Sequence, residues 1–272
     1  MSLPPQTKAM SEHEQNRRAW DAMVRQKQRF ARPALDKDYE ATLKELDPCG
    51  WLGDVRGKKL LCLAAGGGRQ GPIYAAAGAD VTVVDISAAQ LELDREVGSE
   101  LKLDLRTVQT SMDDLSMFSA GEFDLVIQPV STCYLSDVRI IYAEVARAIR
   151  PAGVYVSQHK QPTSLQASSD PSLRGYEIVQ PYFHAGPLPP VEGSLHREQG
   201  TLEFLHRWEE LIGAMCRVGF VVEDLTEPKH AELDSPKGSF AHRSAYVAPY
   251  VRIKARRVAA GKASDQSSIV FV

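Results

Sequence analysis

The 272-residue chain lacks the features that define several large classes of protein. Its four cysteines (Cys49, Cys62, Cys133 and Cys216) include no Cys-x-x-Cys pair, which argues against a zinc site or a disulfide framework and favours reduced, mostly buried thiols. No apolar run approaches the length of a membrane span, and residues 1–10 contain no apolar signal-peptide segment. The net charge of −3 argues against electrostatic binding of nucleic acid. We therefore expect a cytoplasmic protein that binds neither a membrane nor nucleic acid.

The most informative segment that is present is a glycine-rich turn between two apolar runs. Residues 59–63 predict a buried strand, residues 66–71 a glycine turn, residues 73–77 a helix, and residues 81–85 a second strand that ends in Asp85. Glycines in such a turn allow positive φ and leave no Cβ to block a ligand. A carboxylate roughly 20 residues downstream can accept ribose hydroxyls. The unit therefore predicts a site for an adenosine-type cofactor on an α/β sheet.

Further apolar segments extend this unit into a doubly wound, mostly parallel α/β sheet of about seven strands. The last two strands are joined without an obvious helix, so we expect the final pair to be antiparallel. The other strands are expected at residues 105–109, 123–128, 152–159, 220–225 and 245–255, and helices at residues 11–30, 38–46, 87–97, 138–149 and 202–218.

The regular patterns also predict how the chain is divided. We expect an N-terminal helical cap over residues 1–46 and a Rossmann-like domain over residues 47–257. Within that domain residues 160–201 are rich in proline, glycine and serine, which indicates a lid or substrate-binding insertion after the fifth strand. Residues 258–272 are expected to form a flexible tail. The oligomeric state is not predicted.

Several short motifs then occur in an order typical of one family. Residues 62–68 read Cys-Leu-Ala-Ala-Gly-Gly-Gly, residues 123–126 read Phe-Asp-Leu-Val, residues 149–153 read Ile-Arg-Pro-Ala-Gly, and residues 218–220 read Val-Gly-Phe. In this order the chain resembles the class I S-adenosylmethionine-dependent methyltransferases, in particular bacterial small-molecule methyltransferases. The resemblance covers about residues 57–256 and implies a seven-stranded sheet with an antiparallel last strand.

The resemblance implies S-adenosyl-L-methionine as the cofactor and in-line methyl transfer to a small-molecule acceptor. Cys62 stands where the family has an acid, Ala64 where it has its first glycine, and Ser111 where it has the acid near the adenine. Gln128, at the end of a strand, is either a cofactor contact or a buried polar residue. The cofactor residues implied are Ala64, Ala65, Gly66, Gly68, Asp85, Ile86, Ser111, Met112 and Gln128.

Candidates for the acceptor side come from aromatic and histidine residues near the same edge of the sheet. His159 ends the fifth strand and is either a general base or a hydrogen-bonded histidine at a strand end. Trp20 of the first helix is either core or pocket wall, and Tyr134, His184 and His206 are further candidates for substrate contacts. No two histidines lie at metal-ligand spacing with a carboxylate, so we expect no metal.

Two other functions fit part of the pattern. Gly66, Gly68 and Gly71 also satisfy the Gly-x-Gly-x-x-Gly fingerprint, and Tyr250 and Lys254 have the spacing of a short-chain dehydrogenase pair, which leaves an NAD(P)-dependent dehydrogenase open. A catalytically silent cofactor-binding partner protein is also open, because the chain departs from the family motif at three positions.

Overall fold

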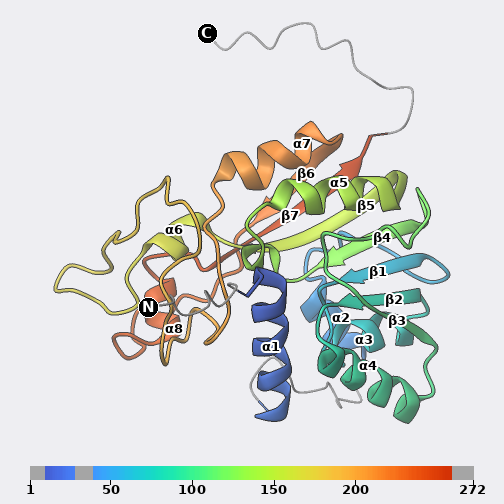
Figure 1. Ribbon diagram of the computed structural model, residues 1–272, viewed down its shortest axis with the longest axis horizontal. Helices are drawn as coiled ribbons and strands as arrows, with labels where there is room; N and C mark the ends of the chain where they lie inside the picture. Colours follow the sequence, from blue (N-terminus) through green and yellow to red (C-terminus); the bar gives the residue numbers. More distant parts are fainter. Residues whose placement is uncertain (1–9, 28–38, 259–272) are drawn as a thin grey trace, which may run out of the picture.

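A seven-stranded mixed sheet forms the centre of the structure (Figure 1). The computed structural model describes residues 10–27 and 39–258. The strand order is β3-β2-β1-β4-β5-β7-β6, and β7 runs antiparallel to both of its neighbours while the other pairs are parallel. This confirms the predicted α/β fold with an antiparallel last strand. The strands are β1 (Lys59–Leu63), β2 (Asp80–Asp85), β3 (Leu105–Gln109), β4 (Phe123–Gln128), β5 (Ile149–Lys160), β6 (Phe220–Thr226) and β7 (Tyr250–Arg257).

Helices cover both faces of the sheet. Those on one face are α5 and α7, and those on the other are α2, α3 and α4, while α1 packs against α4. The helices are α1 (Glu12–Arg25), α2 (Tyr39–Leu46), α3 (Gln70–Ala76), α4 (Ala88–Leu101), α5 (Val138–Ala148), α6 (Pro162–Gln166), α7 (Ala214–Arg217) and α8 (Phe240–Ser244), with a 3₁₀ turn at Thr132–Tyr134 and a π-helical turn at Glu209–Gly213.

Two helices begin after a serine N-cap. The Oγ of Ser11 accepts from the N–H of Glu14 at 3.3 Å, and the Oγ of Ser87 accepts from the N–H of Gln90 at 3.1 Å. Each bond satisfies one of the N–H groups that a helix leaves unpaired in its first turn. These caps set where α1 and α4 begin, and both helices contribute to the site described below.

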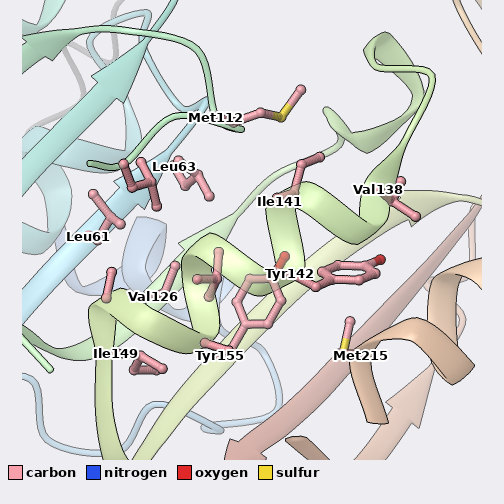
Figure 2. Close-up of a cluster of buried hydrophobic side chains, with 14 of the residues drawn as sticks. Leu61, Leu63, Met112, Val126, Val138, Ile141, Tyr142, Ile149, Tyr155 and Met215 are labelled. Atoms are coloured by element: carbon pink, nitrogen blue, oxygen red, sulfur yellow. The ribbon is translucent and has the colours of Figure 1, made fainter. Parts of the chain in front are cut away.

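The larger part of the core lies between the sheet and α5 (Figure 2). Tyr142 of α5 and Tyr155 of β5 are fully buried, with their ring centroids 6.3 Å apart in an edge-to-face arrangement. Figure 2 shows Met215 of α7 on the far side of Tyr142 from β1. This packing fixes α5, and with it the turn that precedes α5 at the carboxyl ends of the strands.

The structure corrects three expected boundaries. Residues 202–206 are extended instead of helical, because the N–H of Phe204 donates to the carbonyl of Cys133 at 2.7 Å and the regular turns begin only at Glu209. Residues 240–244 form α8, which the sequence analysis missed, so β7 begins at Tyr250. The first helix ends at Arg25, Gln26 and Lys27 follow as a turn, and residues 28–30 of its expected range lie outside the described residues.

The expectation of mostly buried thiols holds for two of the four cysteines: Cys62 and Cys133 are buried, while Cys49 and Cys216 are exposed. Among residues 10–27 and 39–258, no helix combines the length and the apolar character needed to span a membrane. The cytoplasmic location stays a prediction. The expected tail lies outside the described residues except for its first position.

Beyond the carboxyl ends of the parallel strands lies a lobe, which we define as residues 160–206 and 227–249 (Figure 1). Leu165, Leu188 and Leu205 form its own small core. The predicted insertion over residues 160–201 makes up most of the lobe. Arg243 of α8, only 2% exposed, joins α8 to α6. Its guanidinium donates to the carbonyls of Ser164 at 2.7 Å, Ala167 at 3.1 Å and Ser168 at 2.9 Å.

Replacing Arg243 with methionine leaves these three carbonyls without their donor. We expect the free energy of unfolding to fall by about 2–4 kcal/mol, and limited proteolysis to cleave the chain near residues 161–180. Urea unfolding measures the first effect. Arg174→Met, at an exposed position of the same lobe, is the control and should change the stability by less than about 0.5 kcal/mol. Equal effects of the two substitutions would contradict this role of Arg243.

Candidate functional site

A cavity of about 620 Å³ opens at the carboxyl ends of β1, β2 and β4, between the glycine turn, α1 and the lobe. Open α/β sheets bind ligands at this edge, and ligand sites commonly have volumes of about 300–1,000 Å³. The cavity is therefore the candidate functional site.

The glycine turn presents bare backbone to this cavity. Gly66 and Gly67 both line it, and Gly67 and Gly68 have φ values of 117° and 70°. A Cβ on Gly66 would lie 2.8 Å from the Cβ of Gln90 and 3.0 Å from a carboxylate oxygen of Asp85, so only glycine fits. Ala64, where the family has its first glycine, also has a left-handed φ of 49°. The turn thus keeps the shape of a nucleotide-binding turn despite the alanine.

Asp85 ends β2 at the wall of the cavity. Its Oδ2 accepts from the N–H of Gly66 at 3.0 Å and its Oδ1 from the N–H of Ser87 at 2.9 Å. Each carboxylate oxygen has two lone pairs, so both oxygens keep one for a further donor. Burial raises the pKa of Asp85 to about 6. Two adjacent hydroxyls of a ribose are therefore a good match for this carboxylate.

Asp94 of α4 is a buried carboxylate that the sequence analysis missed. It is 0% exposed, and its Oδ2 accepts from the N–H of Gly67 at 2.9 Å. Asp94 thus supports the turn from α4, whereas the family motif has its acid at position 62 of β1. Burial, followed by the charge of Asp94, raises the pKa of the Cys62 thiol. The signal in the sequence is an acid between Leu91 and Val97 on the apolar face of a helix.

Most of the predicted site residues line this one cavity, although they come from five separate segments. Trp20 and Tyr134 meet edge to face, with ring centroids 5.6 Å apart. The predicted residues in the lining are Trp20, Ala64, Ala65, Gly66, Asp85, Ile86, Ser111, Met112 and Tyr134. Their individual roles stay predictions. Gly68 belongs to the turn but not to the lining.

The structure places Gln128 and His159 elsewhere. Gln128 is 2% exposed; its Nε2 donates to the Oγ of Ser131 at 2.8 Å and its Oε1 accepts from the hydroxyl of Tyr155. His159 is 0% exposed, with its ring nitrogens 2.9 Å from the Oγ1 of Thr132 and 2.8 Å from the Oγ of Ser157.

Of the two alternatives for His159, these contacts favour the hydrogen-bonded histidine over the general base. Burial lowers its pKa to about 3, and hydroxyl groups occupy both of its nitrogens. Successive side chains of a strand point to opposite faces. His159 packs 6.4 Å from the ring of Tyr142 in the core, while its neighbour Gln158 lines the cavity.

His184 and His206 also lie outside the lining. His206 is buried and its Nε2 donates to the carbonyls of Thr132 at 3.1 Å and Leu135 at 2.9 Å, so it holds the turn before α5. His184 is half-buried in the lobe, with its Nε2 3.2 Å from the carbonyl of Pro187. Neither histidine lines the cavity, although Leu135, which His206 binds, does.

A buried charge network joins the lobe to the cavity. The Nζ of Lys160, at the end of β5, lies 2.6 Å from the Oε2 of Glu198 and 3.0 Å from the Oε1 of Glu203. Arg197 binds the other oxygen of Glu203 at 2.9 Å, and the hydroxyl of Tyr134 donates to Glu198 at 2.8 Å. No periodic pattern in the sequence relates these residues, so the analysis of the sequence missed the network. Of the network residues, Tyr134 and Glu198 line the cavity.

The described part of the chain contains no group of three His, Cys, Asp or Glu side chains arranged to hold a metal ion. The absence of a metal stays a prediction. A seven-stranded sheet with an antiparallel last strand, and a cavity bounded by a glycine turn and an acid, together define a class I methyltransferase fold.

Comparison with known proteins agrees with this class. The family described as "Methyltransferase domain" matches residues 61–157. The uncharacterized methyltransferase YbaJ of Bacillus subtilis is 35% identical over 196 residues, which cover 71% of this chain and 77% of that protein.

Solved structures share the fold at lower identity. An S-adenosylmethionine-dependent methyltransferase from Mesorhizobium loti superposes with a TM-score of 0.62 at 19% identity, over 80% of this chain and 100% of that one. The geranyl diphosphate C-methyltransferase of Streptomyces coelicolor, solved with Mg²⁺, geranyl diphosphate and S-adenosyl-L-homocysteine, superposes with a TM-score of 0.60 at 19% identity, over 93% and 100%.

The chain belongs to the class I S-adenosylmethionine-dependent methyltransferases. It is an S-adenosylmethionine-dependent methyltransferase, with S-adenosyl-L-methionine as the methyl donor. The dehydrogenase and silent-partner alternatives are thereby set aside. In the structure Lys254 binds Glu223 at 3.1 Å, so it is not paired with Tyr250 for hydride chemistry.

The buried Asp94 predicts a specific dependence of stability on pH. Burial raises its pKa from 3.8 to about 7. Between about pH 4 and pH 7 the folded chain therefore holds a proton that the unfolded chain has released, and the free energy of unfolding falls as the pH rises. An asparagine at this position cannot ionise, but its side-chain carbonyl can still accept from the N–H of Gly67. The free energy of unfolding of Asp94→Asn, relative to that of wild type, should therefore rise by about 2–4 kcal/mol from pH 4 to pH 7. Above pH 7 this difference should stay constant.

Urea unfolding at several pH values measures this difference. Glu96→Gln, on the exposed side of α4, removes the same charge and is the control, for which we expect no such rise. If the free energies of unfolding of wild type and Asp94→Asn differ by the same amount from pH 4 to pH 7, the raised pKa of Asp94 is contradicted.

Proposed function

We propose that the protein transfers the methyl group in line to a small-molecule acceptor that lies in the same cavity as the cofactor. One observation carries this proposal: the cavity continues from Asp85 and the glycine turn to Phe240 of the lobe and Tyr250 of β7. Donor and acceptor therefore have one shared, partly enclosed space.

The side chains and backbone groups that line the cavity match the chemical groups of S-adenosyl-L-methionine. Asp85 offers a free lone pair on each oxygen for the ribose hydroxyls, and Gly66 and Gly67 offer backbone without a Cβ for the methionine part. Ile86 and Met112 offer apolar surface for the adenine, with Ser111 beside them. These roles are part of the proposal.

When bound, the cofactor supplies a methyl group that its sulfonium makes electrophilic. The protein's task is then to align the acceptor with that methyl group, and alignment can contribute about 7–11 kcal/mol. The face of Trp20 favours a cation nearby by about 0.5–2 kcal/mol, whereas the ring of Tyr134 already has the Nζ of Lys160 5.9 Å from its centroid. The buried His159 has no part in this scheme.

Water exclusion is the proposed task of α1 and of the insertion over residues 160–201. The Nε2 of Gln15 in α1 donates to the carbonyl of Gly200 in the insertion at 3.3 Å. Asn16 binds Leu202, the residue that follows the insertion: its Oδ1 accepts from the N–H of Leu202 at 2.7 Å and its Nδ2 donates to the carbonyl of Leu202 at 3.2 Å. The same Nδ2 donates to the carbonyl of Tyr134 at 2.7 Å. The helical cap and the insertion thus meet over the cavity, which supports their proposed action as a lid.

Asp85→Asn tests the cofactor half of the proposal. Loss of charge-assisted hydrogen bonds should weaken the binding of S-adenosylhomocysteine by about 1.5–3 kcal/mol, or roughly 10- to 150-fold, as measured by isothermal titration calorimetry. Because the free protein has a pKa of about 6 at Asp85, the affinity of wild type should rise from pH 5 to pH 7 and then level off. The variant should lack this rise.

Asp80→Asn, at the exposed start of the same strand, is the matched control and should bind as wild type does. If Asp85→Asn also keeps its full affinity at pH 7.5, Asp85 does not hold the ribose.

A further inference from the structure

The part of the cavity that faces the lobe has a wall of aromatic rings. The rings of His230 and Tyr250 lie 5.6 Å apart, and the ring of Phe240 lies 5.5 Å from the first and 6.2 Å from the second. All three residues line the cavity. The rings of Phe240 and Tyr250 are inclined by 35° to each other and His230 meets both edge to face, so the wall offers apolar ring surface to a planar molecule.

Arg252 of β7 lines the cavity beside this wall. It is half-buried, and its Nε donates to the Oε1 of Gln158 at 2.7 Å. Within the described residues, no carboxylate oxygen lies within 4.0 Å of its guanidinium. Asp47, which adjoins Arg252 in a smaller cavity of about 70 Å³, uses its two oxygens on backbone N–H groups.

The other charged side chains of the lining are already engaged. Each has a partner of opposite charge or backbone N–H donors: His13 binds Asp113 at 2.9 Å, Arg69 binds Glu45 at 3.2 Å, Glu198 binds Lys160 at 2.6 Å, and Asp85 accepts from Gly66 and Ser87. Among these described residues, only Arg252 has no protein carboxylate beside the Nη groups of its guanidinium.

A half-buried cation is stabilised by a counter-ion, and a guanidinium matches a carboxylate through two parallel hydrogen bonds. The bond from Nε to Gln158 fixes the plane of the guanidinium and leaves the Nη donors available. A monoanion balances the single charge of Arg252, whereas a phosphate dianion would not.

We propose that the acceptor is a small carboxylic acid with a planar apolar body, whose carboxylate binds Arg252 and whose body lies against Phe240, Tyr250 and His230. The inference rests on the proposed function, because it assigns the acceptor half of that cavity. Arg252 thereby selects for acceptors of one charge type.

The test compares acids with their neutral carboxamides, which have almost the same shape. Benzoate, 4-hydroxybenzoate, cinnamate and indole-3-carboxylate, each beside its amide, are titrated into the full chain saturated with S-adenosylhomocysteine. Wild type should bind at least one acid of the panel, and should bind it at least tenfold more tightly than its amide.

Arg252→Gln should reduce this preference to less than twofold and leave the affinity for S-adenosylhomocysteine within twofold of wild type. Arg252→Lys keeps the positive charge but loses the planar guanidinium that can make two parallel hydrogen bonds. Its preference for the acid should lie between those of wild type and Arg252→Gln. Arg256→Gln is the matched control on the same strand, since Arg256 binds Glu223 outside the cavity; it should keep the full preference.

Binding of no acid in the panel, equal binding of acids and amides to wild type, or a preference that survives Arg252→Gln would each overturn the inference. Failure of S-adenosylhomocysteine to bind wild type is a separate result, which would overturn the proposed function instead.

Discussion

The close approach of the glycine turn to the carboxylate after β2 is the contact on which the site depends. The parallel register pairs Leu63 of β1 with Val84 of β2, so the two strands end side by side. Gly66 can then donate to Asp85 because it has no Cβ, and a Cβ there would lie 2.8 Å from Gln90. The same contact leaves the turn's backbone and the carboxylate facing one cavity, and the supporting carboxylate of Asp94 lies beneath the turn.

This arrangement explains how the chain departs from the family motif without losing its shape. Position 62 holds a buried cysteine, and Asp94 of α4 accepts from the N–H of Gly67 in the turn. Position 64 holds an alanine at a left-handed φ of 49°. A turn of this shape is thus compatible with a cysteine on the first strand and a buried carboxylate on α4.

The sequence predicted the sheet and the cofactor half of the cavity because both follow from local patterns. Buried strands are short apolar runs, the turn needs glycine, and an acid at the end of an apolar run can be recognised directly in the sequence. The acceptor half depends on which side chains meet across the lobe. The network of Lys160, Glu198 and Glu203 brings together residues that no periodicity relates. At His159 the sequence left two alternatives open, and alternation favours the hydrogen-bonded histidine, because it sends Gln158 to the cavity and His159 to the core.

A crystal structure of the chain with S-adenosylhomocysteine and an acid of the panel tests the central claim most directly. The account predicts both ribose hydroxyls at about 2.6–3.0 Å from the oxygens of Asp85, with the sulfur facing the space between Tyr134 and Arg252. A nucleoside bound away from Asp85, or a sulfur directed away from the lobe, would contradict it.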